Sequence, residues 1–378
     1  MLLELSSEQG VFRATTAKYL AERVSAAALR ALRDDPDGFD LDYWRAGADL
    51  GWTSLLIGED QGGGSISGAP LVDLGLIAYE FGRGAAPGPL VPTNIVAERL
   101  SVTGGAHAAV VKELAAGTSI ASWCLAEPAS NGHPGTVNTT VRTDGPDIVV
   151  DGVKRPVEAA GSATHFLVVG RTGTGLTQVL VPADTAGVSV TPMRAVDLTR
   201  RFCLVTFDGV RLSADAVVGD LGDASDDVRR QLQLALTMTS AESVGAMQRA
   251  FDVTLTWAFD RFSFGRPLAT YQEIKHRFAD MATWLEASHA ITDAAVAAVE
   301  AGAPEADELV SAAKSYVGEY GSELLQDCVQ IHGGIGLTFE HNLHLYLRRH
   351  TANRTLFGTP SVHRQRVADI VAHQDRPA

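Results

Sequence analysis

Apolar residues recur with two different spacings along the chain, and the spacing changes twice. Up to about residue 118, and again from about residue 228, they return every three or four positions, which is typical of amphipathic helices. Between these parts, short runs rich in Val, Thr and Leu are separated by Gly, Asp and Pro, as in β-strands. The strand-like runs cover residues 120–124, 136–143, 148–150, 166–169, 178–181, 188–192 and 204–207.

The order of helices, strands and helices predicts a mostly α-helical fold with a β insert. We expect an α-helical domain over residues 1–118, a small β-sheet or barrel over 119–222, and a helical bundle over 223–378. The helical periodicity is clearest over 17–33, 40–50, 71–81, 94–100, 229–262, 271–301, 304–328 and 343–353.

Charge and composition narrow the classes of function. The chain has 31 basic and 45 acidic residues, a formal net charge of −14, which argues against a general binder of nucleic acid or anionic membranes. It has no uninterrupted apolar stretch of about 18 residues, and its start lacks the basic segment of an export signal. Its three cysteines are far apart and form no CxxC pair, so we expect neither disulfides nor a zinc site, and a reducing, cytoplasmic location.

One segment with candidate chemistry runs from Arg261 to Gln272 and continues to Met281. It combines a helix terminus, a Gly265-Arg-Pro turn, a guanidinium and a carboxamide, which suit a phosphate or pyrophosphate. Taken alone, it is more simply explained as a basic surface turn between two helices.

A second segment, residues 330–349, begins Gln330-Ile-His-Gly-Gly-Ile-Gly. Its glycines permit close backbone approach to a ligand, but no strand precedes them and the GxGxxG spacing is missing, so a Rossmann fingerprint is excluded. His341 and His344 lie three residues apart, yet without an HExxH arrangement they predict hydrogen bonds within the fold rather than a metal site.

Together the two segments and the order of elements resemble the acyl-CoA dehydrogenase family, flavoenzymes that form α,β double bonds in acyl-CoA thioesters. The resemblance covers essentially the whole chain. The stretch from Leu50 to Trp52, with Glu59-x-x-Gly-Gly-Gly, resembles the amino-terminal helical part, and Leu125-Ala-Glu-Pro resembles the start of the β domain. It implies an amino-terminal helical domain, a middle β-barrel and a carboxy-terminal four-helix bundle.

The resemblance also implies FAD as cofactor and assigns residues to it. In the family these two segments hold the adenine-dinucleotide half of an FAD that belongs to a neighbouring subunit. The matching positions in this chain are Arg261, Ser263, Phe264, Gln272, Gln330, Gly333 and Gly334.

The positions that cover the flavin ring in relatives differ here. Ala126 replaces a threonine, and Pro156 and Glu158 stand where a tryptophan and a hydroxyl fall in relatives. Proline neither stacks like an indole nor donates a hydrogen bond, and a carboxylate beside reduced flavin is electrostatically unfavourable. We therefore expect a degraded flavin-ring site in this chain, with a shifted loop that binds flavin through other residues as the alternative. Glu127 is either a flavin or substrate contact or a strand-end carboxylate.

The reaction requires a carboxylate base in a dry pocket to remove the proton α to the thioester. Most relatives carry it where this chain has Gly358, and a second family location corresponds to Ala235. Glu242 lies seven residues after Ala235, on the same helical face about 10 Å further along the axis. Its position resembles that of a central-helix glutamate in the subgroup of two-subunit acyl-CoA dehydrogenases linked to sterol side-chain breakdown. Glu242 is the predicted base; the alternative is a structural carboxylate paired with an arginine or a capping group.

Taken together, these expectations describe a subunit of an α2β2 acyl-CoA dehydrogenase that shares one FAD per heterodimer with a homologous chain. The expected substrate is a bulky or sterol-derived acyl-CoA, and the expected electron acceptor is an electron-transfer flavoprotein or another carrier. The alternatives are a homomeric acyl-CoA dehydrogenase or oxidase, and a catalytically silent structural subunit.

Overall fold

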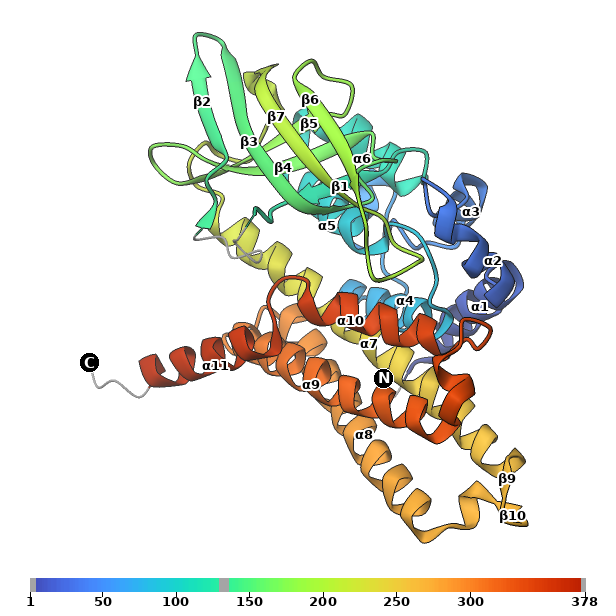
Figure 1. Cartoon of the computed structure of the whole chain (residues 1–378). Coiled ribbons are helices and arrows are strands. Elements are labelled where there is room, and N and C mark those ends of the chain that lie inside the picture. Colours follow the sequence, from blue (N-terminus) through green and yellow to red (C-terminus); the bar gives the residue numbers. More distant parts are fainter. Residues whose placement is uncertain (1–4, 129–135, 375–378) are drawn as a thin grey trace. The chain divides into compact units, whose positions relative to one another are not determined.

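The computed structural model describes residues 5–128 and 136–374, which form two compact units built from alternating stretches of the chain (Figure 1). One unit contains Met1–Arg30, Gly75–Ala86 and Leu236–Ala378, and we call it the bundle unit. The other contains Ala31–Leu74 and Pro87–Ala235, and we call it the sheet unit. The first four residues, part of the segment in which we expect no export signal, lie outside the described residues.

Long helices make up the bundle unit. Within it, α9 packs against α8, α10 and α11, and Figure 1 shows α8 and α9 running alongside each other. The helices that belong to this unit, wholly or in part, are α1 (Ser7–Arg23), α2 (Ala26–Ala31), α4 (Pro70–Gly84), α7 (Ser225–Asp260), α8 (Gln272–Glu300), α9 (Ala306–His332), α10 (Leu343–Thr355) and α11 (Pro360–Gln374).

Two glycines let α4 and α7 approach closely. A Cβ added to Gly82 would lie 1.8 Å from the carbonyl oxygen of Glu242, and one added to Gly245 would lie 2.0 Å from that of Tyr79. No side chain fits in either gap, so the two backbones are in direct contact. This packing fixes where Glu242 sits in the bundle.

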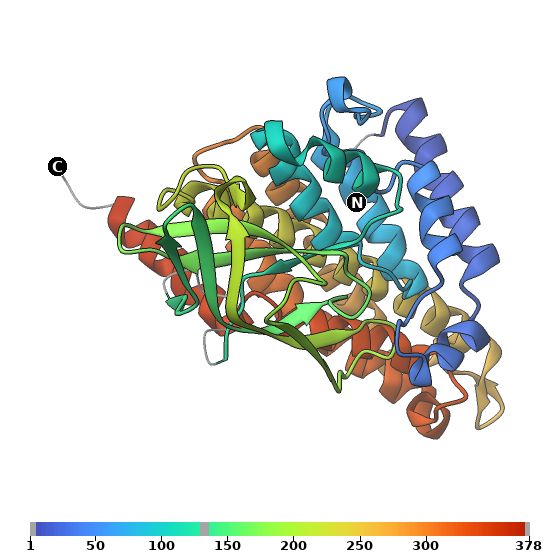
Figure 2. The ribbon, with the colours of Figure 1, turned by 90° about the horizontal axis from the view of Figure 1, so that it is seen from above.

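The sheet unit combines helices with a curved sheet, whose strands are the green ribbons of Figure 2. Its helices are α3 (Leu41–Asp49), α5 (Leu90–Thr103) and α6 (Ala108–Ala115), and α5 packs on β1. Along the main path the strand order is β6-β7-β3-β2-β4-β5-β8, and β1 pairs in parallel with β4. The strands are β1 (Ala121–Cys124), β2 (Thr140–Asp144), β3 (Asp147–Glu158), β4 (His165–Arg171), β5 (Leu176–Pro182), β6 (Val188–Met193), β7 (Phe202–Ser213) and β8 (Val217–Val218).

The expected mostly α-helical fold with a β insert is confirmed, but several element boundaries were wrong, and the strand expected over 204–207 is the longer β7. The helix expected over 17–33 is two helices, with the first beginning at Ser7 after a Ser6–Gln9 capping box. The strand expected over 148–150 extends to Glu158, and β3 shifts its register against β7 twice, between Val150 and Gly152 and between Lys154 and Val157. The second shift accommodates Pro156, which cannot donate to a ladder.

The described ranges contain neither a candidate membrane-spanning helix nor a candidate metal-binding cluster. No helix within residues 5–128 and 136–374 is long and apolar enough to cross a membrane. No group of three or more His, Cys, Asp or Glu side chains in the same ranges is placed to hold a metal ion.

Candidate functional site

The first predicted segment forms a hairpin in the bundle unit, directly after α7. Strand β9 (Phe262–Ser263) pairs with β10 (Arg266–Pro267), and the Tyr271 hydroxyl donates to the carbonyl oxygen of Ser263 at 2.7 Å. The guanidinium of Arg266 lies over the Tyr271 ring, 3.9 Å from its centroid. These contacts hold the hairpin on the start of α8, where Gln272 is the first residue.

The turn of this hairpin presents an aromatic ring to solvent. Phe264 and Gly265 are its two central residues, with φ angles of +48° and +78°. Turns with both φ angles positive favour Asn-Gly, and an aromatic residue in the left-handed region costs roughly 1–3 kcal/mol. Phe264 is 98% exposed, so no packing within this chain compensates for that cost. The ring therefore faces solvent rather than any other part of the described chain.

The second predicted segment follows α9 in the same unit. The helix ends at His332, and Gly333 caps it with a φ of +66° and a bond from its N–H to the carbonyl oxygen of Gln330. Gly333 and Gly334 are exposed, and a Cβ added to either would meet no atom within 4 Å. The space above the two glycines is therefore open on this chain.

Ring contacts join the two segments. The Arg261 guanidinium lies 5.8 Å from the centroid of the Trp257 ring, and that ring stacks on His332 at 5.1 Å with an interplanar angle of 17°. Since His332 directly precedes the glycine pair, Arg261 and Gly333 lie on one surface of the bundle unit. Gln272 and Gln330 are exposed as well, and Gln272 bonds to His276 at 2.9 Å. We call the surface of Arg261, Ser263, Phe264, Gln272, Gln330, Gly333 and Gly334 the dinucleotide surface.

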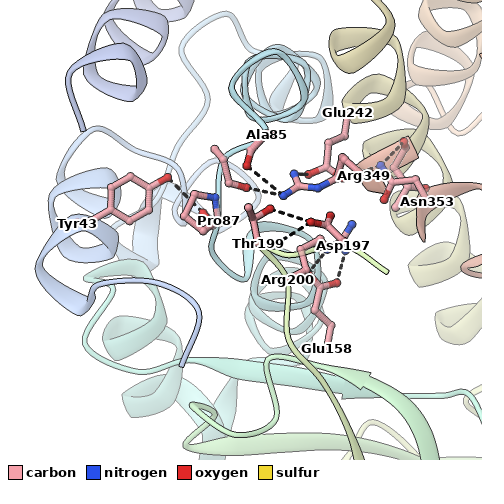
Figure 3. Close-up of polar contacts among 12 residues, drawn as sticks. Tyr43, Ala85, Pro87, Glu158, Asp197, Thr199, Arg200, Glu242, Arg349 and Asn353 are labelled. Carbon is pink, nitrogen blue, oxygen red and sulfur yellow. Dashed lines mark hydrogen bonds and ion pairs between the residues drawn. The ribbon is translucent and has the colours of Figure 1, made fainter. Parts of the chain in front are cut away.

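Glu242, the predicted base, lies elsewhere in the bundle unit and is 4% exposed (Figure 3). Its Oε1 accepts a hydrogen bond from Arg349 Nη1 at 2.6 Å, and its Oε2 accepts one from Asn353 Nδ2 at 2.8 Å. Arg349 is fully buried and also donates to the carbonyl oxygens of Ala85 and Ala86, at 3.4 and 2.8 Å. Both carboxylate oxygens of Glu242 are thus engaged, in the arrangement expected for a structural carboxylate.

The two other family positions for a base carry no carboxylate in this chain. Ala235 is fully buried on α7. Gly358 has a φ of +111°, and a Cβ there would lie 2.8 Å from His363 Nε2. A side chain at residue 358 would therefore meet both backbone strain and a steric clash.

In the sheet unit, Glu158 is paired with an arginine that the sequence did not indicate. Arg200 donates to Glu158 Oε1 from Nε at 2.6 Å and to Oε2 from Nη2, and its side chain is 2% exposed. The pair compensates the charge of the Glu158 carboxylate within this chain, and the electrostatic objection to a flavin beside Glu158 stays a prediction. The objection based on Pro156 stays a prediction.

Glu127 is a strand-end carboxylate in this structure. It accepts hydrogen bonds from the backbone N–H groups of Asn138 and Thr139 at 2.7 and 2.9 Å, and from Lys154 Nζ at 2.8 Å. Burial alone would raise the pKa of Glu127, but Lys154 and the two N–H groups together lower it from 4.5 to about 2. Glu127 therefore fastens the chain after β1 to β3.

Comparison with known proteins places the chain in a family. Three acyl-CoA dehydrogenase domain families match it: the N-terminal domain over residues 6–118, the middle domain over 122–210 and the C-terminal domain over 226–372. The acyl-CoA dehydrogenase IpdE2 of Mycolicibacterium smegmatis is 28% identical over 357 residues, which are 94% of this chain and 96% of that protein.

Solved structures agree with this placement. A variant of the Tcur3481-Tcur3483 steroid ACAD is 26% identical, with a TM-score of 0.88 over 97% of this chain and 98% of that one. The ChsE4-ChsE5 complex from Mycobacterium tuberculosis has the same fold, with 21% identity and a TM-score of 0.89 over the full length of both chains.

The chain belongs to the acyl-CoA dehydrogenase family. The predicted enzyme class, an oxidoreductase acting on CH–CH bonds, and the predicted cofactor, FAD, are confirmed by this membership. The domain boundaries and the assignments of individual site residues stay predictions. Sequence reasoning missed Arg349, Asn353 and Arg200, because nothing in the local pattern marks an arginine or asparagine as the partner of a carboxylate more than 40 positions away.

Proposed function

We propose that this chain is one subunit of a heteromeric acyl-CoA dehydrogenase and that its dinucleotide surface binds FAD held mainly by a homologous partner chain. The observation that carries the proposal is Phe264, a 98% exposed aromatic side chain in a left-handed turn. Backbone strain of this kind persists at binding sites, where a contact requires the conformation. The open space above Gly333 and Gly334 fits the close approach of a cofactor backbone.

The residues of the dinucleotide surface suit the adenine and pyrophosphate part of FAD. The Arg261 guanidinium supplies charge for a pyrophosphate, Phe264 supplies an apolar face for the adenine, and the two glutamines supply carboxamides. FAD bound there would supply the acceptor for the hydride that leaves the β carbon of the acyl-CoA. In the sheet unit, Pro156 offers no hydrogen-bond donor for a flavin ring, which supports a flavin site shared with a partner.

The substrate we propose is a bulky, sterol-derived acyl-CoA, and the assembly we propose is an α2β2 heterotetramer that passes electrons to an electron-transfer flavoprotein. Two similarities support this part of the proposal. One of the similar structures is named the Tcur3481-Tcur3483 steroid ACAD, and another is named the ChsE4-ChsE5 complex.

Glu242 is the candidate base within this proposal, and its Oε1 lies 2.6 Å from Arg349 Nη1. For Glu242 to accept a proton, one of its oxygens must leave Arg349 or Asn353. These same contacts favour a second candidate function, in which Glu242 is structural and this chain completes the site of a partner that supplies the base. The two candidate functions predict different turnover for the substitution Glu242→Gln.

The proposal of a shared site is tested by flavin absorbance. The chain purified alone is expected to be colourless, and the chain co-purified with a homologous acyl-CoA dehydrogenase partner is expected to carry about one FAD per pair. A yellow chain with one FAD per monomer contradicts the shared site and favours the homomeric enzyme.

Phe264→Asn sharpens this experiment, because asparagine suits the turn and removes only the ring. We expect the variant to fold as well as the wild type and to lose FAD from the assembled enzyme. Val102→Ser is the matched control, since Val102 is 70% exposed on α5 and lies outside the dinucleotide surface. Equal FAD retention by all three proteins would refute the role of Phe264.

The role of Glu242 is tested in the assembled enzyme. If Glu242 is the base, Glu242→Gln abolishes turnover while FAD stays bound. If turnover per bound FAD is unchanged, the base belongs to the partner and the second candidate function holds.

A further inference from the structure

A cavity of about 350 Å³ lies within the bundle unit, away from the dinucleotide surface and from Glu242. Helices α1 and α2 and the turn between them form one wall, which is apolar, and α4, α7 and α10 contribute the polar groups. The lining side chains used below are Ala17, Leu20, Glu80, Arg83, Arg249 and Tyr346.

Tyr346 contributes a polar group without a partner. It is 8% exposed, and its hydroxyl makes no hydrogen bond to any residue in the described parts of the chain. The side chain lines the cavity, so its hydroxyl is free to pair with a ligand atom there.

The charges around the cavity leave one arginine uncompensated. Glu80 pairs with Arg13 at 2.7 Å and with Arg83 at 3.8 Å, and Arg83 also pairs with Asp252 at 3.2 Å. These two acids balance these two arginines.

Arg249 on α7 lines the mouth of the same cavity with an exposed side chain, and among the described residues it has neither an ion pair nor a hydrogen bond. The wall therefore carries one excess positive charge beside one free phenolic hydroxyl. Arg30 adds to the positive side of the rim, since it donates to the side chain of the lining residue Asn342.

We propose that this cavity is a binding site for an amphipathic organic monoanion, a carboxylate with an apolar body. A single uncompensated guanidinium matches one carboxylate, which it can hold through two parallel bonds, and the hydroxyl of Tyr346 donates to the same group. The apolar body lies along the wall that contains Ala17 and Leu20. The site is separate from the dinucleotide surface, and this inference does not depend on the proposed function.

The test is equilibrium binding of octanoate to the purified full-length chain, measured by isothermal titration calorimetry without FAD. Octanoate is expected to bind the wild type, and 1-octanol, which has the same body without the charge, is expected to bind at least about tenfold more weakly. Absence of octanoate binding, or equal affinity for the two compounds, overturns the proposal. Tighter binding of octyl phosphate than of octanoate overturns the choice of a carboxylate.

Variants locate the binding. Arg249→Gln is expected to weaken octanoate about tenfold or more while leaving octanol unchanged, and Ala17→Phe is expected to fill the cavity and abolish binding of both. Arg194→Gln is the control, because Arg194 is an exposed arginine of the sheet unit, and it should bind octanoate like the wild type. Wild-type affinity in Arg249→Gln overturns the site, even if Ala17→Phe does not fold.

Discussion

Removing Arg349 should destabilise the bundle unit strongly. In Arg349→Met, which keeps the apolar stem, the carboxylate of Glu242 remains 4% exposed and loses its cation, and two carbonyl oxygens lose a donor. Breaking a buried ion pair by removing one partner costs about 3–5 kcal/mol. We expect a loss of this size in the free energy of unfolding, measured from guanidinium denaturation followed by far-ultraviolet circular dichroism.

A second substitution should restore part of the lost stability and shows that the unpaired charge of Glu242 causes the loss. Adding Glu242→Gln to Arg349→Met removes the uncompensated charge, so the double variant should be more stable than Arg349→Met alone. Arg364→Met is the surface control, because its pair with Glu319 is 3.3 Å long and more than half exposed on the arginine side, and such pairs contribute about 0–1 kcal/mol. A cost below 1 kcal/mol for Arg349→Met, or a double variant less stable than it, would refute the reasoning.

Three further predictions concern the rest of the chain. The pKa of Glu127 is lowered to about 2, so the stability that its carboxylate contributes is present above pH 4.5 and lost as the pH falls from 4.5 towards 2. Unfolding followed by tryptophan fluorescence across this range should show a loss of stability in the wild type that Glu127→Gln lacks. Gly82→Ala should destabilise the protein by about 1–3 kcal/mol in thermal unfolding, whereas Gly10→Ala, with open space around it, should be neutral or stabilising. All three cysteine thiols are buried, and burial raises their pKa, so 5,5′-dithiobis(2-nitrobenzoate) should react at pH 8 only after unfolding; rapid labelling of the native chain would contradict this.

The fold class was predictable from the sequence because periodicity is a local property. The long helices α7, α8 and α9 each repeat their apolar stripe over several turns, and the strands are short Val- and Thr-rich runs. Strand β3 was predicted too short because its continuation past Pro156 depends on the pairing partner β7, which absorbs a shift in register. The register between two strands depends on both of them, so the sequence of β3 alone does not reveal it.

The candidate site was predictable only in part. The residues of the dinucleotide surface came from resemblance to a family, since the turn at Phe264 has no local signature: its positive φ angle falls on a residue that propensity does not favour there. The residue type at Glu242 was visible, but its partner Arg349 lies 107 positions away. Ion pairs over such separations are created by helix packing, which no spacing rule encodes.

The bond from Arg349 to the end of α4 has a consequence for synthesis of the chain. Arg349 donates to the carbonyl oxygen of Ala86, 263 positions earlier, and the bundle unit as a whole combines the first, a middle and the last stretch of the chain. A ribosome that has finished the sheet unit, which ends at Ala235, has not yet made most of the bundle. Until the rest of α7 emerges, α4 lacks the helix whose backbone it contacts at Gly82 and Gly245, so a nascent or prematurely terminated chain is exposed to chaperones and proteases for as long as its final third is missing.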